Sequence, residues 1–301
     1  MAGVLRQKLW GNRIYRYFYF QWMGLYTIFC TKNAVVSYRK SGHTWVRVML
    51  AKVLSLAYGI EKLNMDLVKM VQSRPDIPKI AIVHSLSLGW GIYPVDWKRL
   101  KFTSIYSRSE KIKIGYSFNK KRMVFLVRDP RDVVVSLYFE LTKRHSFYTG
   151  SLEQFIREKY ALKKIVNYMN LWYIEMQRRP QNFMLLRYED MQKDTARELR
   201  RIVDFFGLKN ISDEIIIKAV EFGSIENMRK LETQDAFTDS RLRPINKNDT
   251  ESYKVRKGKV GGYKDYLGEE DIHYMNEYIT LHLQKELGYG AITKDTNNYT
   301  T

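Results

Sequence analysis

A lysine, two hydroxyl side chains and a glycine follow one another closely after a short apolar run. Lys40, Ser41, Gly42 and Thr44 come just after the β-branched run at 34–36, and apolar residues at helical spacing follow them, beginning with Trp45. A glycine-containing turn that leads into a helix offers backbone N–H groups and the positive end of the helix dipole to an anion. These residues therefore predict a phosphate-type anion site. An ordinary turn between a strand and a helix is the alternative.

An arginine and a serine belong to a second strand–loop–helix pattern. Arg128 ends an apolar run, Asp129 suits the N-cap, and Asp132 lies at the third helical position, as in an acidic variant of the capping box. Ser136 follows one turn later. A guanidinium and a hydroxyl at such a place suit phosphate binding. The alternatives are a surface ion pair between Arg128 and Asp132, and a Ser136 hydroxyl bonded to its own backbone.

A third segment near the C-terminus is rich in glycines and cations. Three glycines and four cations lie within nine residues, which are Arg256, Lys257, Gly258, Lys259, Val260, Gly261, Gly262, Tyr263 and Lys264. This composition predicts a mobile basic loop that closes over a polyanion. A solvated surface loop is the alternative.

The elements that must position these residues alternate between strand and helix. Apolar runs followed by helical patterns recur at 34–57, 80–84, 123–143 and 183–206. This alternation predicts an α/β fold, a single-domain P-loop-like mainly parallel sheet flanked by helices on both faces. In such sheets ligands bind at the carboxyl ends of the strands. The fourth pattern is predicted to end at Gly207, and Ser212 to begin the next helix.

Five segments, in this order and register, together resemble the sulfotransferases that use 3′-phosphoadenosine 5′-phosphosulfate (PAPS). The resemblance covers roughly residues 34–267. Its motifs are SYRKSGHTW (37–45), RDPRDVVVSLYF (128–139), LLRYEDMQKD (185–194), FGSIENMRK (222–230) and RKGKVGGYKDYL (256–267). The resemblance implies the domain limits: a sulfotransferase domain over 31–290, an aromatic-rich N-terminal helix over 1–30 packed on it, and a polar tail over 291–301.

The resemblance also implies roles for individual residues. Lys40 would contact the oxygen that bridges phosphate and sulfate, Trp45 would stack on adenine, and His84 would take the proton of the acceptor. The implied catalytic residues are His84, Lys40 and Ser136. The implied residues that bind the cofactor are Arg39, Lys40, Ser41, Gly42, His43, Thr44, Trp45, Arg128, Ser136, Tyr188, Ile225, Met228, Arg256, Lys257 and Gly258. Should His84 not be the base, His43 is the competing histidine and Asp96 the first carboxylate to consider.

Three positions depart from the family pattern. Val83 stands where the family has a lysine before its catalytic histidine, which removes one contact to the sulfate. Arg39 replaces a proline and makes the phosphate loop more cationic. Ile225 replaces an aromatic residue, so stacking on adenine is expected from one side.

The implied activity is transfer of a sulfuryl group from PAPS to a hydroxyl, or an amine, of a small molecule or glycan. Two other classes stay open. A P-loop ATP-dependent small-molecule kinase would need the longer GxxxxGK[ST] loop, whereas here Lys40 precedes the serine and glycine. The other class is a non-catalytic module that binds anions or nucleic acid.

The overall charge is strongly positive. The 301 residues carry a net charge of +19, which implies acidic partners. No recognised nucleic-acid-binding pattern accompanies this charge, so we expect a small-molecule or glycan acceptor and no nucleic acid. The five histidines show no ligand spacing, and no metal is expected.

The cysteine content and the N-terminal segment bear on the compartment. The single cysteine, Cys30, precludes an intramolecular disulfide and favours a reducing, cytoplasmic location. The aromatic-rich segment Ile14–Cys30 carries Arg16 and Gln21, which disfavour a membrane span. We expect a helix packed on the domain; a peripheral membrane contact and a true anchor are the alternatives, in that order.

Overall fold

The computed structural model describes residues 31–83, 120–144, 146–158, 161–234, 249–256 and 258–290. Several predictions from the sequence lie outside these described residues. They concern the N-terminal helix over 1–30, the tail over 291–301, and the roles of His84, Asp96 and Lys257.

Four parallel strands form the central sheet in the order β2–β1–β3–β4. They are β1 (Asn33–Ser37), β2 (Ile80–Val83), β3 (Arg122–Val127) and β4 (Phe183–Arg187). Val35 of β1 lies opposite Ile82 of β2 and Val124 of β3. Every residue of β1 is buried, as expected for a central parallel strand that is covered on both faces. The predicted parallel sheet is therefore confirmed.

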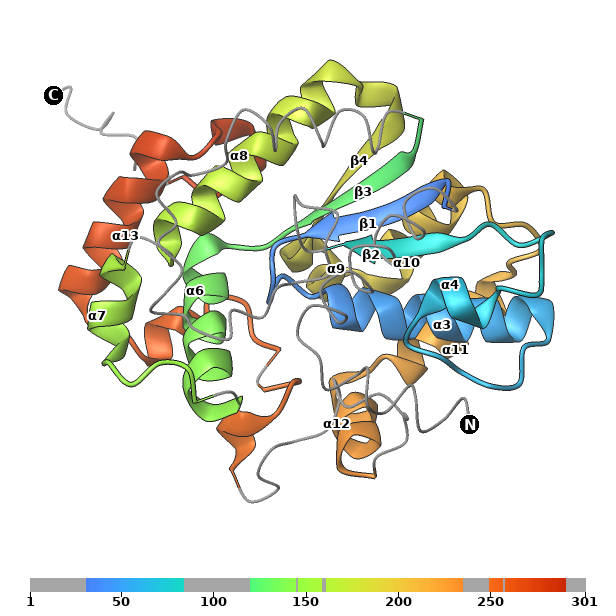
Figure 1. The fold of residues 1–301 in the computed structure, drawn as a ribbon, viewed down its shortest axis with the longest axis horizontal. Coiled ribbons are helices and arrows are strands. Elements are labelled where there is room, and N and C mark those ends of the chain that lie inside the picture. Colours follow the sequence, from blue (N-terminus) through green and yellow to red (C-terminus); the bar gives the residue numbers. More distant parts are fainter. Residues whose placement is uncertain are drawn as a thin grey trace, which may run out of the picture.

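Alternate side chains of the strands enter two separate cores, one on each face of the sheet. Val35 and Leu126 pack with helices α3 (His43–Tyr58), α4 (Leu67–Met70), α10 (Thr195–Phe206) and α11 (Asp213–Phe222). Val36 and Val127 pack on the other face with α6 (Pro130–Phe139), α7 (Leu152–Arg157), α8 (Leu162–Arg178) and α13 (Glu269–His282). Figure 1 shows these two groups of helices on either side of the sheet. The predicted helical layers on both faces are confirmed.

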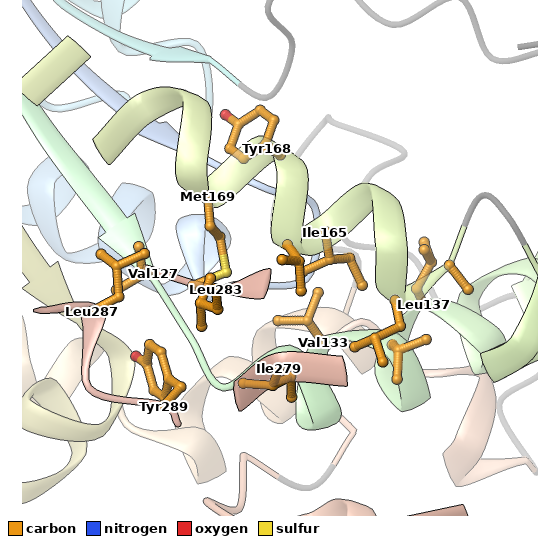
Figure 2. Close-up of a cluster of buried hydrophobic side chains, with 14 of the residues drawn as sticks. Val127, Val133, Leu137, Ile165, Tyr168, Met169, Ile279, Leu283, Leu287 and Tyr289 are labelled. Atoms are coloured by element: carbon orange, nitrogen blue, oxygen red, sulfur yellow. The ribbon is translucent and has the colours of Figure 1, made fainter. Parts of the chain in front are cut away.

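The second core joins the end of β3 to three helices. Figure 2 shows Val127 beside Val133 of α6, with Ile165 of α8 and Ile279 of α13 closing the cluster. Val127 is 1% exposed, so the strand end is fixed immediately before Arg128. Tight packing at this point gives the residues that follow a rigid base.

The predicted helix ends mostly agree with the structure. The carboxylate of Asp129 accepts the N–H of Arg131 at the start of α6, and Ser212 caps α11 through the N–H of Ile215. Gly207 ends α10 with φ 67°. The capping-box prediction for Asp132 is wrong, because its carboxylate accepts N–H groups from the distant C-terminal segment instead.

The remaining elements are short. α6 continues into a π-helical turn, η1 (Glu140–Arg144). The others are η2 (Pro180–Asn182), α9 (Tyr188–Lys193), α12 (Ile225–Thr233), η4 (Thr250–Ser252), η5 (Gly262–Asp265) and η6 (Lys285–Leu287). Turns of π-helix occur frequently at functional sites, and η1 supplies two charged residues to the site described next.

Candidate active site

A cleft of about 850 Å³ lies at the carboxyl ends of β1, β3 and β4. This size falls within the usual range for small-molecule sites, and its place is where parallel sheets bind ligands. Its walls come from four parts of the chain that are far apart in sequence. Among the residues that line it are Lys40, Gly42, His43, Thr44, Trp45, Arg128, Asp132, Ser136, Tyr188, Ile225, Met228, Lys254, Arg256 and Gly258.

The loop between β1 and α3 has an unusual backbone. Lys40 has φ 70° and Gly42 has φ 104°, both in the left-handed region. A Cβ atom on Gly42 would lie 2.6 Å from Cδ2 of Tyr188, so only glycine fits beside this ring. α3 then begins at His43, and the amides of a first helical turn lack acceptors within the helix. The loop geometry therefore suits an anion at the cleft.

One end of the cleft is walled by aromatic and apolar side chains. The indole N–H of Trp45 donates to the carbonyl of Gly223 at 2.8 Å, and the ring meets Tyr188 edge-on at 5.6 Å between centroids. The Tyr188 hydroxyl donates to the carbonyl of Gly258 at 3.2 Å. Gly258 has φ 62°, and a Cβ there would lie 2.4 Å from Cδ1 of Ile225. Flat rings held in this way can sandwich a planar ligand.

Arg128 lies between this end and the C-terminal segment. Its guanidinium lies 4.4 Å from the centre of the Tyr188 ring and donates to the carbonyls of Lys259 at 3.0 Å and Lys40 at 3.3 Å. The ion pair with Asp132 forms at 3.5 Å, but at the cleft wall, where 12% of the Arg128 side chain is exposed. Ser136 lines the same cleft. Both predicted phosphate contacts thus face one space.

Asp132 fixes the C-terminal segment against α6. Its carboxylate accepts the N–H of Gly261 at 2.8 Å and of Tyr263 at 3.0 Å. Burial raises the pKa of Asp132, and the guanidinium of Arg128 opposes that shift. The sequence predicted a mobile loop here, whereas the structure shows 258–263 docked. The reason is that a buried carboxylate satisfies two of its backbone donors.

Arg256 reaches the cleft from the same C-terminal segment. Its guanidinium lies 4.3 Å from the centre of the Phe139 ring and donates to Glu251 at 2.8 Å. Tyr266 also accepts from it. This support leaves Arg256 at the wall of the cleft, as the resemblance implied.

The opposite end of the cleft contains a buried carboxylate with three cations. Glu140 is 2% exposed, and its oxygens contact Lys40 Nζ at 2.6 Å, Arg39 Nη2 at 3.0 Å and Lys254 Nζ at 3.1 and 3.2 Å. Burial lowers the pKa of Lys40 below its usual value, and Glu140 opposes this effect. Burial also lowers the pKa of Lys254 to about 7.

A second buried carboxylate extends this cluster. Glu232 is fully buried and accepts the backbone N–H groups of Lys254 at 2.6 Å and Val255 at 3.1 Å. Arg144 pairs with it at 3.4 Å. Four cations thus surround two buried carboxylates, which leaves an excess of positive charge beside the cleft.

Most, but not all, of the predicted site residues meet at the cleft. Arg39 and Ser41 are not among its lining residues: Arg39 turns to Glu140, and Ser41 is buried within the loop. The sequence did not indicate Glu140, Lys254, Asp132 or Glu232 as site residues. No local signal could have identified Glu140 and Lys254, because they are 114 residues apart and neither lies in a chemically distinctive pattern.

Two further searches concern the described residues only. Among them, no group of three or more His, Cys, Asp or Glu side chains is arranged to hold a metal ion. Within the same part of the chain, every helix is too short or too polar to cross a membrane.

Comparison with known proteins gives consistent matches. A family model described as the sulfotransferase domain matches residues 31–287. Sulfotransferase 2A1 of Rattus norvegicus is 30% identical over 161 residues, which cover 50% of this chain and 52% of that protein, so this match spans about half of each. The 3-beta-hydroxysteroid sulfotransferase of Cavia porcellus is 27% identical over 267 residues, with 84% of this chain and 83% of that protein covered.

The fold is also similar to that of solved structures. The crystal structure of mouse sulfotransferase SULT7A1 complexed with PAP matches with a TM-score of 0.56 and 16% identity. The match covers 84% of this chain and 83% of that chain. At this level of identity the likeness concerns the fold.

Proposed function

Because this chain belongs to the sulfotransferase domain family, we propose that it transfers a sulfuryl group from PAPS to a hydroxyl group of a small molecule. The family gives the reaction type, and the kinase and non-catalytic alternatives are not supported. The donor and the acceptor are the parts that we propose.

The observation that carries the proposal is the meeting of distant residues on one cationic cleft. Lys40, Arg128 and Arg256 come from separate motifs, and all three line the same space. PAPS is an elongated polyanion with a planar base, so it needs cations at its phosphates and flat surfaces at its adenine. Trp45 and Tyr188 supply those surfaces in the same cleft.

Each part of the cleft then has a proposed role. Arg128, Ser136, Arg256 and Gly258, with Lys257, would hold the 3′-phosphate. Trp45, Tyr188, Ile225 and Met228 would enclose the adenine. The residues from Ser41 to Thr44 would bind the 5′-phosphate through the amides at the start of α3.

The transfer itself is an in-line displacement at sulfur. The acceptor oxygen forms a bond to sulfur, the bond from sulfur to the bridging oxygen breaks, and its electron pair stays on the phosphate of 3′,5′-adenosine bisphosphate. The proton of the acceptor would pass to His84, which lies outside the described residues. Lys40 would stabilise the charge that develops on the leaving oxygen.

The acceptor class follows from the named relatives and from the cleft. One relative is named for a 3-beta-hydroxysteroid, so a hydroxyl on a small apolar molecule is the first class to test. Amines and glycans are further classes for the same screen. A cytoplasmic location and a peripheral membrane contact through the N-terminal segment stay predictions.

Two measurements test the proposal together. We expect 3′,5′-adenosine bisphosphate at 100 times its Kd to stabilise the protein by about 2.7 kcal/mol, and ATP with Mg²⁺ to have little effect. A panel of steroid, phenol, amine and glycan acceptors with ³⁵S-labelled PAPS then reports transfer. Stabilisation by ATP with Mg²⁺ but not by the bisphosphate would refute the proposed donor.

A further inference from the structure

Lys254 is a second lysine at the wall of the cleft, directly beside Lys40. Both ammonium groups contact the same oxygen, Oε2 of Glu140, at 2.6 Å for Lys40 and 3.2 Å for Lys254. Both lysines line the cleft, whereas Glu140 is not among the described residues that line it. The carboxylate therefore lies behind the two lysines and holds their ammonium groups side by side.

The position of Lys254 is fixed at both ends of the residue. Glu232, fully buried in α12, accepts its backbone N–H at 2.6 Å, and Glu140 contacts its ammonium group. Only 16% of the side chain is exposed. Such a lysine differs from a surface lysine, since its charged group is already ordered and need not be reorganised when a ligand arrives.

The charge around Lys254 calls for an additional anion. The cations of Arg39, Lys40, Arg144 and Lys254 outnumber the carboxylates of Glu140 and Glu232. Buried charges are stable only when they are paired, so an excess of positive charge at a cleft favours an anionic ligand there. In the proposed reaction, the anionic group nearest to Lys40 is the sulfuryl group of the donor.

We propose that Lys254 is a catalytic residue whose ammonium group contacts the non-bridging oxygens of the sulfuryl group during its transfer. This inference rests on the proposed function and deepens it. Lys254 forms no covalent bond and breaks none. Lys40 stabilises the leaving oxygen, and Lys254 holds the group that moves, so the two lysines serve opposite sides of the bond that breaks.

The pH dependence of the reaction should report Lys254. The charged groups that face it are Glu140 and Arg144 from η1 and Arg39 and Lys40 from the β1–α3 loop, while Glu232 of α12 holds its backbone. Burial lowers the pKa of Lys254 to about 7, so its charge is lost as the pH rises through neutrality. An arginine at this position stays charged throughout that range.

The experiment compares three variants with the wild type. Lys254→Met removes the charge at similar length, Lys254→Arg keeps it, and Lys218→Met removes an exposed lysine of α11 as the matched control. Each protein is measured for kcat with PAPS, for kcat/KM between pH 6 and 9, and for affinity toward 3′,5′-adenosine bisphosphate, which lacks the sulfuryl group. Circular dichroism checks that each variant is folded.

We expect Lys254→Met to lower kcat by about 10²–10³-fold, the usual cost of losing one preorganised charge-stabilising group, with bisphosphate affinity unchanged within about twofold. Wild-type kcat/KM should fall above about pH 7, and this fall should be absent in Lys254→Arg. Wild-type turnover in Lys254→Met, an equal loss of bisphosphate affinity, or an unchanged alkaline limb in Lys254→Arg would each overturn the inference. A wild-type protein that binds no bisphosphate would instead refute the proposed function.

Discussion

The two ends of the cleft hold their shape by different kinds of interaction. At the aromatic end, Tyr188 packs against Gly42 and Gly258, and contacts between rings and backbone fix the wall. At the charged end, Glu140 and Glu232 hold cations in place with few apolar contacts of their own. The first end depends on close approach, so it is sensitive to added atoms. The second depends on charge balance, so it is sensitive to the loss of one partner.

This difference matters because the two ends would serve different parts of one donor. The aromatic end presents surfaces whose shape does not depend on pH. The charged end contains a lysine whose pKa lies near neutrality, so its electrostatic field changes within the physiological range. Binding and catalysis should therefore respond differently to substitution and to pH.

The largest expected effect is at the charged end. Glu140→Gln leaves three cations around a neutral amide, and removing one partner from a buried ionic group typically costs about 3–5 kcal/mol. We expect a loss of that size in the free energy of unfolding, measured by urea denaturation at pH 7. Glu214→Gln, which breaks an exposed pair with Lys218, is the control and should cost less than about 1 kcal/mol. Similar losses in both variants would mean that the cluster adds no stability.

The next effect is on nucleotide binding. Arg128→Ala should weaken binding of 3′,5′-adenosine bisphosphate by about 2–5 kcal/mol, because it removes one side of a partly buried charge pair. Binding of adenosine 5′-phosphosulfate, which lacks the 3′-phosphate, should change much less. Calorimetry with both ligands decides this, and Arg122→Ala at the other end of β3 is the control. Equal losses for the two ligands would contradict the role of Arg128.

A smaller effect is expected where glycine allows close approach. Gly42→Ala places a Cβ 2.6 Å from Tyr188 in a left-handed backbone conformation, so we expect a cost of about 2–3 kcal/mol in unfolding free energy. Thermal unfolding monitored by circular dichroism measures it. Gly268→Ala has open space around the new methyl group and should cost only a few tenths of a kcal/mol. A wild-type melting curve for Gly42→Ala would show that the Tyr188 ring moves freely.

The smallest effect should be a gain in stability. The pKa of Lys254 is lowered from 10.5 to about 7, so its burial destabilises the folded protein fully below pH 7 and progressively less as the pH rises toward 10.5. Lys254→Met should therefore raise the unfolding free energy by about 1–2 kcal/mol at pH 6, within the range for apolar replacement of buried ionic groups. The gain should shrink by pH 9. A gain that is independent of pH would rule out this cause.

The sequence predicted the aromatic end far better than the charged end. Asp129, Gly207 and Ser212 act at helix ends through residues close in sequence, so their roles follow from local patterns. The sheet order follows from the alternation of strands and helices. The residues that line the aromatic end belong to motifs, and their common location follows from the fold.

The charged end could not be predicted, because its pairs join residues more than one hundred positions apart. Arg39 and Glu140 are separated by 101 residues, and Lys254 and Glu140 by 114. Asp132 shows the same limit: its local position suits a capping box, but two backbone N–H groups from the C-terminal segment compete for its carboxylate and are bound instead. Local preference was overridden by a long-range contact in both cases.

The bonds from Asp132 to Gly261 and Tyr263 span 129 and 131 residues, and this has a consequence for biosynthesis. A chain leaves the ribosome from its N-terminus, so Lys40 and Arg128 emerge long before the segment that completes their cleft. A nascent fragment thus carries the cations without the walls that make them selective. Because a ligand stabilises only the state that binds it, the nucleotide can protect finished molecules and not growing ones.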